Sequence, residues 1–400
     1  MSGALISIAD ARQAVLAAIV RLPSEPVPIG IALGRTLAAP LAAAADVPPF
    51  GNSAMDGFAV RHDASSGPLA IVGEARAGRP AATAVGPGEA IRISTGAPLP
   101  DGADAVVRVE DTAESDGRVT VAVPVPAGRN VRPAGDDLRA GERVLEAGAR
   151  LGAAELGVAV AAGAGTLPCA RRPRVAILCT GDELREPGAP LGPGEIHNSN
   201  AAMLAALAQQ EGAEVVAAER VPDERAATEA AFAAALEAAD LVIASGGVSV
   251  GPHDHVKPAL AALGVQERFW RVSLQPGKPT WFGARGERLV LGLPGNPVSS
   301  YVTFLLFARP ALRALQGAAA PLPPRERAAL AGALPRRERE QVVRVRLATA
   351  AAPAPLLTAT ATGPQGSHIT RSLLGADALA FVAPGDGEAA AGAVVPVERI

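Results

Sequence analysis

Glycines, hydroxyls and one carboxylate gather in the segment LVIASGGVSVGPHDHVK, residues 241–257. Four apolar residues are followed by a run of serine and glycine, and Asp254 comes just before a helical pattern. This order predicts a buried parallel strand that ends in a loop able to accept a ligand. Glycine lets the backbone approach a ligand closely, and free N–H groups at a helix start favour anions. Asp254 could hold a metal ion that bridges to phosphate. The alternative is an ordinary tight turn between a strand and a helix.

Polar residues also follow the other strands that we predict in this part of the chain. In an open parallel sheet, ligands bind outside the carboxyl ends of the strands, an edge that we call the rim. Every predicted rim loop carries glycine, a carboxylate, a hydroxyl or lysine, whereas Gly212-Ala213 and Leu263-Gly264 at the opposite edge are plain turns. Carboxylates repel a bare phosphate, so their presence favours a phosphorylated, nitrogen-rich ligand together with a divalent cation. The rim loops are Thr180–Glu183, Pro222–Glu224, Ser245–Gly251, Gln275–Pro279 and Leu293–Pro297.

The histidines are weaker candidates than the carboxylates. His253 and His255 flank Asp254, but a pair spaced by two residues in a loop is more typical of solvent exposure or backbone hydrogen bonding. We expect Asp254 to be the metal ligand, because Mg²⁺ prefers oxygen. His62, His197 and His368 are expected to be structural. The sequence contains no arrangement of residues typical of a covalent nucleophile. For Asp182, the alternative to a site role is that its side chain only caps a turn.

The elements that must position these residues follow from the periodicity of the chain. Residues 174–315 alternate between short apolar runs and helical patterns, which predicts a doubly wound α/β domain over 173–320. Its predicted strands are Arg174–Cys179, Glu214–Ala218, Leu241–Ala244, Arg268–Leu274, Thr280–Phe282 and Arg288–Leu291, and its last helix is Val298–Leu315.

The remaining residues predict three further parts. Residues 44–138 show short β-like runs between turn residues and form a β-rich insert. Helical patterns lie on both sides of it, with Ser7 as a possible cap, so we predict a discontinuous helical domain over 1–43 and 139–172. Residues 325–400 resemble a small β-barrel or sandwich. The run Pro335–Glu340 contains both charge signs and is predicted to be a solvated surface.

Composition limits the partners and the location. A formal net charge of −3 gives no reason to expect nucleic acid or a membrane surface as a partner. Two cysteines, Cys169 and Cys179, make neither a disulfide framework nor a zinc site. We find no signal peptide and no apolar stretch long enough to span a membrane, and therefore expect a cytoplasmic protein.

Seven motifs in one order identify a family. SAMDGFAV, ISTGAPLPDGADAVV, TGDEL, SGGVSVG followed by HDHVK, PGKP, LPGNPVS and TGPQGSH closely resemble the molybdopterin molybdenumtransferases, or molybdenum insertases, a group that includes the C-terminal domain of gephyrin. The resemblance covers nearly the whole chain. It implies an elongated homodimer that converts adenylylated molybdopterin and molybdate into molybdenum cofactor and AMP, assisted by Mg²⁺ or Zn²⁺.

The resemblance also implies roles for individual residues. A cation on Asp254 would polarise the pyrophosphate during its cleavage. Glu183 and Asp223 match acidic positions that the family needs, whereas Asp56 and Thr95 belong to the insert and are expected to approach the rim of the partner subunit. The residues expected to hold the substrate are Gly181, Asp182, Ser245, Gly246, Gly247, Ser249, Pro294, Gly295 and Asn296.

For molybdate, the resemblance implies a set of donors and cations. It points to Lys278, Ser367 and Arg344, with Arg271 at another basic position. Arg344 is placed only by its distance from TGPQGSH and its β-like context, and the alternative is an exposed strand arginine. Gln275 stands where many relatives have lysine, so it keeps donors but lacks a charge.

Two other functions stay open at this point. A molybdopterin adenylyltransferase uses a similar α/β domain, although that domain can act alone. Such an enzyme is also a possible partner. The second alternative is a non-catalytic pterin-binding or scaffold protein, as gephyrin is in its other role.

Overall fold

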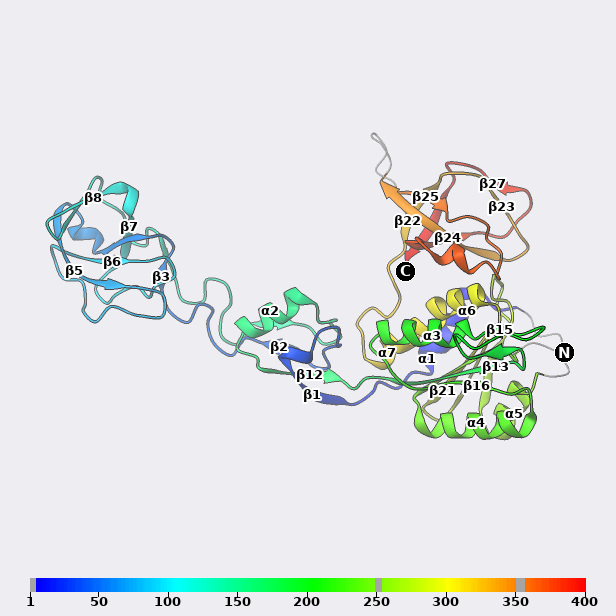
Figure 1. The fold of residues 1–400 in the computed structure, drawn as a ribbon. Coiled ribbons are helices and arrows are strands. Elements are labelled where there is room, and N and C mark those ends of the chain that lie inside the picture. Colours follow the sequence, from blue (N-terminus) through cyan, green and yellow to red (C-terminus); the bar gives the residue numbers. More distant parts are fainter. Residues whose placement is uncertain (1–4, 249–253, 350–356) are drawn as a thin grey trace.

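A computed structural model of the chain describes residues 5–248, 254–349 and 357–400. The molecule is elongated (Figure 1). The β-rich insert lies at one end, a small middle domain follows, and the α/β domain and the C-terminal β domain lie together at the other end. Among the described residues, no helix is long and apolar enough to cross a membrane.

The α/β domain contains a six-stranded sheet in the order β16-β13-β17-β21-β20-β18. The first four strands in this order are parallel, as predicted, whereas β20 and β18 are added by antiparallel pairing. The strands are β13 (Arg174–Thr180), β16 (Glu214–Val221), β17 (Leu241–Ser245), β18 (Gln266–Trp270), β20 (Trp281–Arg285) and β21 (Arg288–Leu293), with the small pair β14 (Leu184–Arg185) and β15 (Ile196–His197) outside the sheet.

Helices cover both faces of this sheet, which explains its near-continuous apolar strands. Alternate residues of β17 enter two different cores: Leu241 and Ile243 pack with one set of helices, Val242 and Ala244 with the other. One face is covered by α1 (Ile8–Ala17), α3 (Ser199–Gln210), α6 (Pro297–Thr303), the π-helical η4 (Phe304–Ala308) and α7 (Arg309–Leu315), and the other by α4 (Arg225–Ala238) and α5 (Val256–Ala262) (Figure 1).

Two predictions need correction here. The strand predicted at Arg268–Leu274 is two strands, β18 and β19 (Leu274–Gln275), because Arg271 takes a left-handed backbone conformation with φ +73° and turns the chain. The assignment of the whole of residues 1–43 to the middle domain is wrong for α1. Ser7 does cap this helix, but Ile8, Ala11 and Val15 pack into the α/β core.

The middle domain is built from two separated segments, as predicted. Its helical content is limited to α2 (Ala153–Ala161), and antiparallel pairs join the two segments. The pairs are β1 (Ser24–Pro28) with β12 (Thr166–Ala170) and β2 (Leu41–Ala42) with β11 (Arg143–Leu145). The single-turn 3₁₀ helix η1 (Ile29–Ile31) follows β1.

The insert is a β domain, as predicted, with a six-stranded sheet in the order β7-β4-β6-β5-β9-β8. Gly57–Val60, the end of the SAMDGFAV motif, is β4, a fully buried strand that lies between β7 and β6 in this sheet. The strands are β3 (Asn52–Ser53), β4 (Gly57–Val60), β5 (Gly67–Ala75), β6 (Glu89–Ile93), β7 (Ala105–Arg108), β8 (Thr112–Ser115), β9 (Arg118–Val121) and β10 (Val131–Arg132), with the 3₁₀ turns η2 (His62–Ala64) and η3 (Val109–Asp111).

The C-terminal domain is a closed barrel, because β24, β25, β22, β28 and β26 pair in a ring that returns to β24. The short β19 of the α/β domain adds to β24 on its outer edge and pairs Gln275 with Gln341. The elements are β22 (Glu326–Leu330), β23 (Leu334–Pro335), β24 (Glu340–Thr349), β25 (Leu357–Ala361), η5 (Thr370–Leu373), β26 (Ala378–Val382), β27 (Glu388–Ala389) and β28 (Val394–Arg399). Strand addition therefore fixes the barrel to the α/β domain beside the rim.

Candidate functional site

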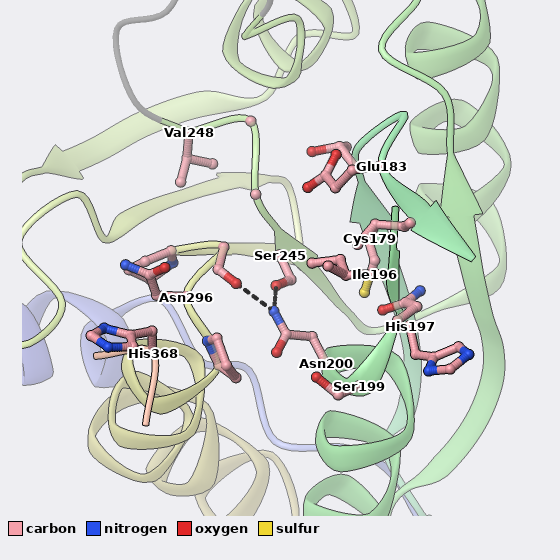
Figure 2. A pocket seen from close by; sticks show the side chains of 18 of the residues that line it. Cys179, Glu183, Ile196, His197, Ser199, Asn200, Ser245, Val248, Asn296 and His368 are labelled. Carbon is pink, nitrogen blue, oxygen red and sulfur yellow. Dashed lines mark hydrogen bonds between the residues drawn. The ribbon is translucent and has the colours of Figure 1, made fainter. Parts of the chain in front are cut away.

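A cavity of about 580 Å³ opens at the rim of the α/β sheet. Three strand ends, the start of α3 and a loop of the barrel form its wall, and Figure 2 shows Glu183 across from Asn296 and His368. We call this the rim cavity. Among the predicted site residues, it brings together Glu183, Ser245, Gly246, Gly247, Pro294, Gly295 and Asn296.

The glycines after β17 are required by the packing around them. Gly246 and Gly247 both have positive φ, +94° and +63°. A Cβ on Gly247 would lie 2.5 Å from a methyl carbon of Val256, and one on Gly246 would lie 2.9 Å from the carbonyl oxygen of Thr180. Only glycine therefore keeps this loop close to β13 and α5, where its backbone lines the cavity.

Asn200, which sequence reasoning missed, ties two rim loops together. Its Nδ2 donates to the Ser245 hydroxyl and to the Gly295 carbonyl, both at 2.8 Å (Figure 2). Ser300 donates to the Pro294 carbonyl, so its oxygen can accept from Ser245 at 3.3 Å. The hydroxyl of Ser245 is thus already engaged within the wall. The signal for Asn200 was its position in the first turn of a helix that starts at the rim.

The acidic side of the rim comes from two loops. Glu183 is exposed and lines the cavity. Asp182 and Asp223 lie beside it, and each backbone N–H approaches a carboxylate oxygen of the other residue, at 3.4 and 3.3 Å. Gly181 has φ +152°, a backbone conformation that residues with a side chain rarely adopt, and its Cα lies next to the flexible carboxylate of Glu183. The predicted acids are therefore adjacent, but only Glu183 faces the cavity.

Asp254 lies after the end of the described glycine loop and precedes α5. Ser249 and His253 lie outside the described residues. In the part of the chain that is described, no three metal-ligating side chains cluster. A closed Zn²⁺ site needs such a cluster. Mg²⁺ does not, because it is commonly held by one or two carboxylates together with substrate phosphates and water. Asp254 and Glu183 are the single carboxylates that the glycine loop and the rim could provide to such an ion.

A second cavity, of about 380 Å³, lies where β19 meets the barrel, and we call it the barrel cavity. Gln275 and Arg344 line it, as do three residues that sequence reasoning did not select: Arg337, Gln341 and Gln365. Its remaining lining residues are apolar or glycine: Pro276, Leu334, Pro335, Val342, Val343 and Gly366.

Arg344 is fully buried, which excludes the alternative of an exposed strand arginine. The face of β24 that carries Val343 and Val345 fills the barrel, so Arg344 lies on the opposite face with Val342. Its Nη2 donates to Ser372 at 2.9 Å, and its Nε has no partner among the described residues. Burial lowers its pKa to about 10, so it remains a cation near neutral pH.

The segment Gln365–His368 separates the two cavities. Gln365 lines the barrel cavity and His368 the rim cavity. Between them, the hydroxyl of Ser367 accepts from the Asn296 amide at 3.0 Å. His197 and His368 both belong to the wall of the rim cavity. The Nε2 of His197 lies 3.0 Å from the Ala189 carbonyl oxygen, a contact of the structural kind expected for this residue.

Two predicted cations do not line either cavity. Lys278 is exposed, between Pro276 of the barrel cavity and Pro279 of the rim cavity. Arg271 packs on Trp270, with its guanidinium carbon 4.0 Å from the ring centroid. Lys257 also packs on Trp270, with its Nζ 3.3 Å from the ring centroid. Trp270 also donates to the Val248 carbonyl at 3.1 Å, which anchors the glycine loop.

Asp56 and Thr95 lie together, but far from the rim of the same chain. The Thr95 N–H and hydroxyl both donate to one Asp56 oxygen, at 2.7 and 3.0 Å, and both residues are exposed. They belong to the insert, at the opposite end of the molecule from the α/β domain (Figure 1).

Comparison with known families assigns each part of the chain. Residues 6–163 match the MoeA N-terminal region (domain I and II). Residues 176–314 match a probable molybdopterin binding domain, and residues 327–400 match the MoeA C-terminal region (domain IV).

Individual relatives agree with these matches. A molybdopterin molybdenumtransferase of Haemophilus influenzae is 40% identical over 72% of this chain and 71% of the relative. Molybdopterin molybdenumtransferase 2 of Mycobacterium tuberculosis is 38% identical over 92% of each chain. The crystal structure of the molybdopterin biosynthesis moeA protein from Pyrococcus horikoshii has a TM-score of 0.84 at 27% identity, covering 99% of this chain and 100% of that one.

Proposed function

The chain belongs to the molybdopterin molybdenumtransferase family, and on that premise we propose that its rim cavity binds adenylylated molybdopterin and its barrel cavity binds molybdate. The family places the chain in molybdenum cofactor biosynthesis as a transferase that inserts molybdenum. The observation that carries the assignment of the two cavities is that they adjoin across Gln365–His368 and differ in chemistry.

The rim cavity suits a phosphorylated pterin. Its glycine loop presents backbone groups at close range, and Asn200 fixes that loop to the Leu293–Pro297 loop. The barrel cavity suits a small dianion, because it combines the buried cation of Arg344 with amide side chains. In this proposal water cleaves the pyrophosphate bond of the substrate and AMP leaves, while the two thiols of the pterin bind molybdenum and one oxygen of molybdate departs as water with their protons.

Mg²⁺ is part of the proposal. When bound by Asp254 and the substrate phosphates, it would act as a Lewis acid on the pyrophosphate. Glu183 borders the rim cavity, and Asp182 and Asp223 lie beside it, so their negative charge would favour the cation over a bare phosphate.

A homodimer completes the proposed site. Asp56 and Thr95 are too remote from the rim of their own chain to act there, so they would serve the rim of a second copy (Figure 1). The middle domain exposes the apolar side chains of Ile31 (68%), Leu33 (65%) and Val160 (56%), which supports a contact between copies there.

The buried, unpaired thiols of Cys169 and Cys179 agree with a cytoplasmic location. A molybdopterin adenylyltransferase would supply the substrate and is a proposed partner.

The direct test supplies the purified protein with adenylylated molybdopterin, Mg²⁺ and molybdate, without ATP, and measures AMP. We expect AMP release together with molybdenum bound to the pterin. Release that requires added ATP would favour an adenylyltransferase. Binding of the pterin without any release of AMP would indicate a carrier.

A further inference from the structure

The polar side chains that line the barrel cavity are all positive or neutral. Two arginines and three glutamines contribute to its wall: Arg337, Arg344, Gln275, Gln341 and Gln365. No carboxylate belongs to the described lining. Arginine has donors only, and each glutamine amide carries two N–H groups, so this wall is complementary to an oxyanion that bears more than one negative charge.

Arg344 supplies one charge but is already partly engaged in the barrel. It donates to the Ser372 hydroxyl, and its Nη1 approaches the Gln365 carbonyl at 3.4 Å. It is held among neutral groups, because its described contacts include no carboxylate. One fixed guanidinium leaves a tetrahedral dianion only half neutralised.

Arg337 differs from the neighbouring arginines of the Pro335–Glu340 run. Arg336 donates to the Ala383 carbonyl at 3.1 Å, and Arg339 donates to the Leu274 carbonyl at 2.9 Å. The side chain of Arg337 makes no hydrogen bond or ion pair with any residue that the structure describes, and it lines the cavity. Arg337 is exposed, as the prediction of a solvated surface for this run requires, and it also borders the barrel cavity.

We propose that Arg337 supplies the second positive charge of the barrel cavity and thereby sets its affinity for molybdate. The proposal rests on the proposed function of this cavity and adds a binding residue to it. Gln275 reaches the same cavity from the α/β domain, next to Gln341 in the β19–β24 pair, and contributes donors without charge. A cation on the barrel side would make up for the charge that residue 275 does not provide.

The test measures molybdate affinity of the full-length protein by calorimetry at two salt concentrations. Arg337→Ala should weaken binding by about three- to tenfold and reduce its salt dependence, since one cation of a partly exposed site is lost. Arg336→Ala is the matched control, because it removes a neighbouring arginine that does not line the cavity, and should bind molybdate within about twofold of wild type.

A rescue variant separates a local charge from a structural effect. Adding Gln275→Lys to Arg337→Ala restores a cation from the opposite wall, and we expect most of the lost affinity to return. If wild type and Arg337→Ala bind molybdate equally well, the role of Arg337 is refuted, but the proposed function of the barrel cavity is not. Equal losses in both arginine variants, or no rescue by lysine, would also refute it. If wild type binds no molybdate, the proposed function of the cavity itself falls.

Discussion

Arg12 and Arg344 are both buried, and their contacts show how context decides the role of the same residue type. Arg12 forms a bidentate pair with the buried Glu398 at 2.7 and 2.6 Å, which joins α1 to the barrel, and Arg325 pairs with the same carboxylate at 3.0 Å. Arg344 has no such carboxylate partner among the residues described. A buried cation that only neutral groups contact is costly for folding, and a bound anion would offset that cost.

Residue types alone predicted part of the site. Glu183 and Asn296 could be selected because carboxylates and amides after strand ends converge at the rim. Arg337 could not be selected, since its place in the cavity depends on how β19 adds to the barrel. The same holds for the burial of Arg344, because a charged residue in a predicted strand is usually exposed.

At the residue scale, Asp254 carries the sharpest prediction. Asp254→Asn removes the charge that would hold Mg²⁺, so AMP release should fall by about a hundredfold or more, and Mn²⁺ binding followed by electron paramagnetic resonance should weaken. His255→Ala, next to it in the sequence, is the control and should keep the metal. AMP release by Asp254→Asn at the wild-type rate would contradict the metal role.

At the scale of elements, the loops at the two edges of the α/β sheet differ in what they require. Gly247 at the rim and Gly264 at the opposite edge both have positive φ, +63° and +77°. A Cβ at Gly247 would collide with Val256, whereas one at Gly264 would meet nothing within 4 Å. Alanine would therefore strain the backbone at both positions, but it would collide with a neighbouring side chain only at Gly247.

This contrast predicts different outcomes for two alanine variants. Gly247→Ala should displace the glycine loop and weaken AMP binding by about tenfold or more, because the loop must move from α5. Gly264→Ala should cost about 1 kcal/mol of folding free energy and leave AMP affinity unchanged. Calorimetric AMP titration and thermal unfolding check both. Unchanged AMP affinity in Gly247→Ala would show that this loop does not form the nucleotide site.

Helices and strands could be predicted where one hydrophobic periodicity continues along the segment. They could not be predicted where contacts with distant parts of the chain determine the structure. The parallel strands of the α/β domain follow from apolar runs that helices cover on both faces. In contrast, β4 is hidden in a motif of small and polar residues, and the two-residue β19 exists only because β24 offers an edge. The membership of α1 in the α/β core likewise depends on long-range packing.

At the scale of the whole molecule, the elongated shape prevents a single chain from completing the proposed site. The insert holds Asp56 and Thr95 at one end, and the rim with Glu183 lies at the other (Figure 1). The order of domains was predictable from the sequence, because the change from helical to β-like patterns marks each boundary. Their separation in space was not, since it depends on the short pairs of the middle domain.

The central claim is that AMP is released at a rim that the insert of a partner subunit completes, and mixed dimers test it most directly. Asp56→Asn and Asp254→Asn should each be inactive alone. Purified heterodimers that carry one copy of each variant contain one intact site of two, so they should release AMP at about half the wild-type rate. If the site were formed within one chain, every site of these heterodimers would carry a substitution. Heterodimers with no more activity than the two single variants would therefore contradict the account.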